Sequence, residues 1–74
     1  SFLDRLDAAV RDAGGAVSEF RFLQYQVQFA VELREARARF GLHYKGNGSI
    51  SSISPIGSFD ADCSQFVESV LEKL

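Results

Sequence analysis

Apolar residues recur every three or four positions near both ends of the chain, which is the spacing of helices that bury one side. The pattern predicts a helix over residues 2–13, ended by two glycines, and another over residues 60–73, begun by Ser58 or Asp60. The apolar positions are Phe2, Leu3, Leu6, Ala9, Val10 and Ala13 in the first helix, and Cys63, Phe66, Val67, Val70, Leu71 and Leu74 in the last.

The period changes to two between these helices, and aromatic and β-branched residues alternate with polar ones. Residues 17–33 are predicted to form one long strand, with a phase slip at Phe22-Leu23 that would suit a bulge. A second strand is predicted over residues 36–45, after a turn near Arg34-Glu35. Because Ala, Glu, Leu and Arg favour helix, residues 30–39 also fit a short connecting helix.

A tight turn is predicted at Asn47-Gly48, since both residue types tolerate positive φ. The third strand then contains Ile50 and Ile53 and ends near Pro55. The predicted fold is therefore α+β: helix, three-stranded antiparallel meander, helix, with both helices on one face of the sheet. We expect residues 1–74 to form a single small domain, and a chain that starts with Ser rather than Met would suit a fragment of a longer protein.

Composition narrows the classes of function. The net charge is −2, which argues against a general nucleic-acid binder, and no apolar run is long enough for membrane insertion. One Cys and one His exclude an internal disulfide framework and a multi-histidine metal centre in a single chain. We therefore expect no metal and no cofactor, while the compartment stays open between cytoplasm and exterior.

Cys63 and His43 are the only nucleophile–base pair that the chain offers. A small thiol- or histidine-dependent enzyme is accordingly one alternative function. However, alternation places His43 on the strand face opposite Phe40 and Leu42, whereas Cys63 lies on the apolar side of its helix. A buried structural thiol and a solvated histidine are the preferred interpretation, so no catalytic residues are predicted.

The polar face of the predicted sheet is a better candidate site. It would carry uncharged glutamines and arginines, namely Gln24, Gln26, Gln28, Arg37 and Arg39. Uncharged polar rows and an edge with few charges favour docking of another strand or sheet. A small core also favours self-association. The predicted partner is a protein, with a homo-oligomer expected and no nucleic acid.

Two families share parts of this pattern. The order helix, three strands, helix resembles the double-stranded RNA-binding domain, which makes an RNA module a further alternative, although the last helix begins with acidic rather than basic residues. Residues 40–67 resemble the periplasmic C-terminal domain of TolA and TonB in strand, Asn-Gly turn, strand and helix. The latter resemblance implies a non-catalytic docking domain in the periplasm; without it, a cytoplasmic location is expected.

Overall fold

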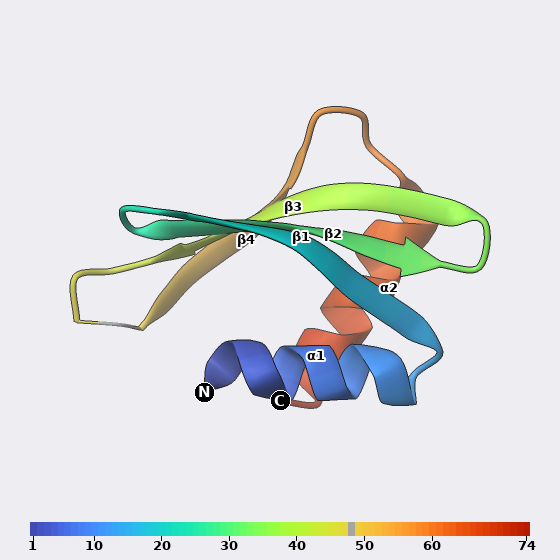
Figure 1. Cartoon of the computed structure of the whole chain (residues 1–74), viewed down its shortest axis with the longest axis horizontal. Coiled ribbons are helices and arrows are strands. Elements are labelled where there is room, and N and C mark those ends of the chain that lie inside the picture. Colours follow the sequence, from blue (N-terminus) through green and yellow to red (C-terminus); the bar gives the residue numbers. More distant parts are fainter. Residues whose placement is uncertain (48) are drawn as a thin grey trace.

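Four antiparallel strands lie between two helices in the computed structural model, which describes residues 1–47 and 49–74. The strands pair in chain order as a single sheet, β1-β2-β3-β4 (Figure 1). The elements are α1 (Phe2–Asp12), β1 (Gly15–Leu23), β2 (Gln26–Leu33), β3 (Ala36–Tyr44), β4 (Ile50–Ile56) and α2 (Ala61–Glu72). The α+β class is therefore confirmed, while the prediction of three strands is wrong.

The error in strand number lies in residues 17–33, which form two strands rather than one. The chain reverses at Gln24-Tyr25, where Tyr25 has a φ of 62°, and Phe22 then faces Val27 across the pair. Tyr25 holds a left-handed conformation that Gly or Asn adopts more easily, so the sequence shows no ordinary turn signal there. The phase slip at Phe22-Leu23 marked this reversal and not a bulge.

The β1 bulge instead lies between Ser18 and Arg21, where the register with β2 shifts. Glu19 takes a φ of 56° within it. The predicted reversal at Arg34-Glu35 is confirmed, and Arg34 again has a positive φ, of 57°. Residues 30–39 are thus strand, turn and strand, and the connecting-helix alternative is wrong.

The next hairpin joins β3 to β4. In the turn predicted at Asn47-Gly48, Asn47 Oδ1 accepts hydrogen bonds from the backbone N–H (3.0 Å) and hydroxyl (2.8 Å) of Ser49. Gly48 lies outside the described residues. The side chain of Asn47 thus accepts hydrogen bonds from the residue two positions further on, as Asn commonly does in turns.

Both helices begin at capped residues. Ser1 and Asp4 form a capping box on α1, and the side chain of Asp60 accepts a hydrogen bond of 2.9 Å from the backbone N–H of Cys63 on α2. After α1, Gly14 takes a φ of 94° and turns the chain into β1. The expected helix boundaries are therefore confirmed to within a residue or two.

The core lies between the helices and one face of the sheet, and both helices lie on the same side of it (Figure 1). It consists of Leu6 and Val10 from α1; Val27, Phe29 and Val31 from β2; Ala38, Phe40 and Leu42 from β3; and Cys63, Val67 and Val70 from α2. Because side chains alternate along a strand, the even-numbered positions of β2 point away from this core. Across the described part of the chain, no helix is both long and apolar enough to cross a membrane.

The candidate binding face of the sheet

The face of the sheet that the helices leave uncovered is built from residues that pair across the strands. Directly opposed residues of antiparallel strands point to the same side, so the register defines rows across the face. One row contains Leu23, Gln26, His43 and Ser52, and the next contains Arg21, Gln28, Gly41 and Ser54. A third contains Ser18, Ala30, Arg39 and Ile56, and a fourth contains Ala16, Glu32 and Arg37. We call these four rows the open face.

In the first two rows, Gln26 lies at the centre of a hydrogen-bonded cluster with His43 and Gln28. Its side-chain Nε2 lies within hydrogen-bond distance, 3.1 Å, of Nε2 of His43. Gln28 Nε2 donates to Gln26 Oε1 at 3.4 Å. Both glutamines are half-buried.

Gly41 makes this arrangement possible. A β-carbon at this position would lie 2.6 Å from Gln26 Nε2 and 3.1 Å from Ile56 Cδ1. The absent side chain therefore leaves the space that the Gln26 amide occupies. Nothing in the local pattern of the sequence distinguishes Gly41 from a glycine that merely interrupts a strand.

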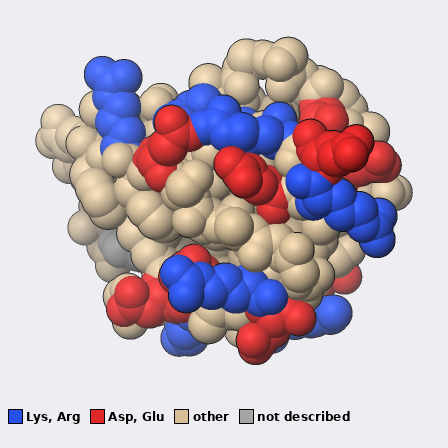
Figure 2. All heavy atoms as spheres, turned by 45° about the vertical axis from the view of Figure 1, so that its right-hand side comes forward, with Lys and Arg blue, Asp and Glu red and all other residues tan. Residues whose placement is uncertain are grey.

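The other two rows carry charges that are already paired. Arg37 forms an ion pair with Glu19 and lies 3.5 Å from Glu32, while Arg39 lies 4.0 Å from Glu19. Glu19 reaches both arginines from the β1 bulge. These side chains are between 31% and 56% exposed, so the pairs add little to stability, but they reduce the positive field of the face. On the side of the domain that Figure 2 shows, acidic and basic side chains lie next to each other.

The predicted partner-binding residues divide between two places. Gln26, Gln28, Arg37 and Arg39 lie together on the open face, whereas Gln24 lies in the turn between β1 and β2. The expectation that an edge with few charges takes up another strand is wrong for β2, because this strand pairs with β1 on one side and β3 on the other. These residues can therefore contact a partner through their side chains but not by adding a strand.

The thiol and the imidazole lie on different sides of the sheet. Cys63 is fully buried in the core, and His43 contacts Gln26 on the open face. Burial raises the pKa of the Cys63 thiol above its ordinary value, and the carboxylates of Asp60 and Asp62 raise it further. The structure therefore does not bring together the nucleophile–base pair considered for an enzyme. Within the described residues, no group of His, Cys, Asp and Glu could hold a metal ion.

Fold and site together describe a small α+β domain with one helix-covered face and one open, polar face. Residues 1–74 match the TATA-binding-like protein domain of the TOTE conflict systems, and the chain belongs to this family. No curated protein and no solved structure matches it. The family match overturns the resemblance to TolA and TonB, which depended on residues 40–67 alone and on a strand, turn, strand and helix that many folds share. The resemblance in element order to the double-stranded RNA-binding domain is also wrong, because residues 1–47 and 49–74 contain four strands between the helices and not three.

Proposed function

We propose that this chain is a non-catalytic binding domain of a defence-related system and that its open face contacts double-stranded DNA. The family name supports both parts, since it describes a TATA-binding-like domain within conflict systems. Proteins that place a sheet against the minor groove read it with Arg, Asn and Gln side chains. The sequence-based expectation of a protein partner without nucleic acid is the second candidate function.

The observation that carries the proposal is the hydrogen-bonded cluster around Gln26. An amide offers both donors and acceptors, and the minor groove presents acceptors on A·T pairs and an added donor on G·C pairs. Gln26 and Gln28 lie on the sheet surface with Arg21 opposite Gln28 on β1. The two amides, which would contact the base edges, therefore lie close to the Arg21 guanidinium, which would contact a phosphate.

The charge of the face limits the expected affinity. The acidic partners of Arg37 and Arg39 must give way before either arginine can neutralise a phosphate. Arg21, Arg37 and Arg39 would release about three counterions, so the logarithm of affinity should fall with that of salt with a slope of roughly −3. We expect binding in the range of about 1–100 μM, weak and dependent on salt.

A protein docked on the same face is the second candidate function. The ion pairs of Arg37 support it, because they leave a face without a strong field of one sign. Such a face suits another polar surface, including that of a second copy. This candidate retains the sequence-based prediction for the four residues that lie on the face.

Fluorescence anisotropy with a labelled A·T-rich duplex at low salt tests the proposal. Gln28→Lys should strengthen binding and Gln28→Glu should weaken it by a similar factor, because the two variants differ in their charge toward phosphate. Arg11→Gln on α1 serves as the control for loss of one positive charge away from the face.

Absence of DNA binding at low salt would overturn the DNA proposal. If light scattering then shows a dimer that both Gln28→Lys and Gln28→Glu dissociate, the second candidate is correct instead. Circular dichroism of each variant confirms that the sheet is intact.

A further inference from the structure

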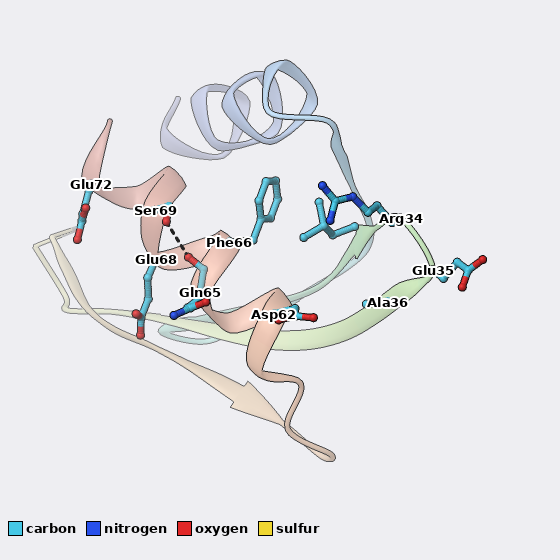
Figure 3. A pocket seen from close by; sticks show the side chains of 10 residues that line it. Arg34, Glu35, Ala36, Asp62, Gln65, Phe66, Glu68, Ser69 and Glu72 are labelled. Carbon is cyan, nitrogen blue, oxygen red and sulfur yellow. Dashed lines mark hydrogen bonds between the residues drawn. The ribbon is translucent and has the colours of Figure 1, made fainter.

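A second surface, separate from the open face, lies between α2 and the turn that joins β2 to β3. It is a groove of about 1070 Å³ on the helix-covered side of the domain (Figure 3). Its lining combines apolar, polar and acidic side chains from these two segments. We call it the α2 groove.

The floor of the α2 groove is apolar and held in place by packing. Phe66, Leu33 and Ala36 line it and are each half-buried. The ring of Phe66 packs against the backbone at Gly15, where a β-carbon would lie 2.9 Å from its Cε2 atom. The floor is therefore a fixed aromatic surface rather than a flexible side chain at the edge of the molecule.

The rim along α2 is acidic. Asp62, Glu68 and Glu72 line the groove from the helix, and among the described residues none of these three carboxylates takes part in an ion pair. Arg34 is the single cation of the lining, and Figure 3 shows its side chain turned toward the groove. Glu35 points away from the groove in the same view. The groove therefore has a net negative charge.

The polar lining follows the length of the helix. Asp62, Gln65, Ser69 and Glu72 are spaced three, four and three residues apart, which places them in one row on a helical surface. The row extends over about 15 Å, the length of about five residues of an extended peptide. Carboxylates spread over this length suit several cations in a row rather than one bound ion.

We propose that the α2 groove docks a segment of a partner protein in which Lys or Arg alternates with bulky apolar residues. The cations pair with the carboxylates of the rim, and the apolar side chains cover Phe66. Nucleic acid does not fit this groove, because its phosphates would face uncompensated carboxylates. The proposal is independent of the function of the open face, since α2 covers the opposite side of the sheet.

Fluorescence anisotropy with three labelled peptides of equal length tests this proposal on the full chain. One peptide alternates Leu and Lys, the second alternates Leu and Glu, and the third alternates Ser and Lys. We expect measurable binding of the Leu/Lys peptide only, because the second lacks the charge and the third lacks the apolar contacts.

A combined variant, Asp62→Asn, Glu68→Gln and Glu72→Gln, should weaken binding of the Leu/Lys peptide roughly tenfold, since each exposed pair contributes modestly. The matched control, Asp12→Asn, Glu19→Gln and Glu32→Gln, makes the same change in net charge away from the groove and should leave binding within about twofold of the parent.

Three results of the peptide experiments would overturn the proposal. The first is equal weakening in both variants, which would indicate general charge attraction. The second is binding of the Leu/Glu peptide as tight as that of the Leu/Lys peptide. The third is no binding of the Leu/Lys peptide. Light scattering completes the test: if the parent chain is a dimer and only the groove variant is a monomer, the occupant is a second copy, and the assignment to a partner protein is wrong.

Discussion

The side-chain amide of Gln26 occupies the space above Gly41, on the neighbouring strand, that any other residue at that position would fill. A β-carbon there would lie 2.6 Å from Gln26 Nε2. From this position Gln26 also contacts His43 and accepts a bond from Gln28. The glycine therefore determines how the central polar side chains of the open face are arranged.

Substitution Gly41→Ala is expected to move Gln26 without unfolding the domain. The nearest obstacle is the end of a flexible side chain, and Ala restricts the unfolded chain more than Gly, so stability should change by less than about 1 kcal/mol. The Gln26 amide resonances in an NMR spectrum should shift as the contact with His43 is lost. Gly46→Ala is the control, because its β-carbon would meet only Tyr25 Cε1, at 3.9 Å. Unchanged Gln26 resonances in Gly41→Ala would contradict the prediction.

Gly15→Ala should be the more damaging substitution. Its β-carbon would lie 2.9 Å both from the backbone oxygen of Glu32 and from Cε2 of Phe66. Backbone in a paired strand cannot move aside cheaply, so we expect a loss of about 1–3 kcal/mol in the free energy of unfolding. Urea unfolding followed by circular dichroism measures this, with Gly41→Ala as the comparison. A similar cost at both positions would show that β1 adjusts more easily than its contacts indicate.

The buried thiol predicts a loss of stability at alkaline pH. The pKa of Cys63 is raised by burial and by Asp60 and Asp62, so the unfolded chain ionises at a lower pH than the folded one. Above the ordinary thiol pKa the unfolded state binds fewer protons, and the free energy of unfolding must fall as the pH rises toward the folded pKa. Urea titrations at neutral and alkaline pH, with Cys63→Ala as the control, measure the thiol's share of this decrease. An identical decrease in Cys63→Ala would contradict it.

Removing the carboxylate of Glu19 should strengthen DNA binding by the open face. Glu19 pairs with Arg37 and lies 4.0 Å from Arg39, whereas Arg37 keeps Glu32 as a partner. Glu19→Gln therefore frees mainly Arg39, and binding at low salt should strengthen several-fold, because this arginine no longer exchanges an acidic partner for a phosphate. Anisotropy titrations with the labelled duplex give this affinity. Asp12→Asn is the control for net charge, and an equal effect there would exclude a specific role for Glu19.

The local patterns of the sequence were sufficient for the two helices and for the hairpins that join β2 to β3 and β3 to β4. Asp60 and Ser1 carry their capping signals in a few adjacent residues, and alternation identified the strand that begins near Ala36. The reversal at Gln24-Tyr25 was missed because neither residue is a usual turn former. There the pairing of Phe22 with Val27 across the β1–β2 hairpin overrides the weak turn preference of Gln24 and Tyr25.

Local patterns were likewise insufficient for the candidate sites. Alternation correctly placed Gln26 and Gln28 on one face of the sheet. It wrongly added Gln24, which lies in the turn between β1 and β2. The contact of Gln26 with Gly41 and the approach of Phe66 to Gly15 join residues far apart in the chain. Such contacts depend on register and helix placement, which a period of two or 3.6 does not specify.

The strict neighbour-to-neighbour order of the strands has a kinetic consequence. Each strand of the meander pairs with the one that precedes or follows it, so every hairpin closes a short loop and no distant segment must be found first. Domains dominated by such short-range pairings cross their folding barrier quickly, commonly within about milliseconds. These strands should accordingly reach their native pairing soon after α2 is available to cover them, with little time spent exposing their aromatic side chains.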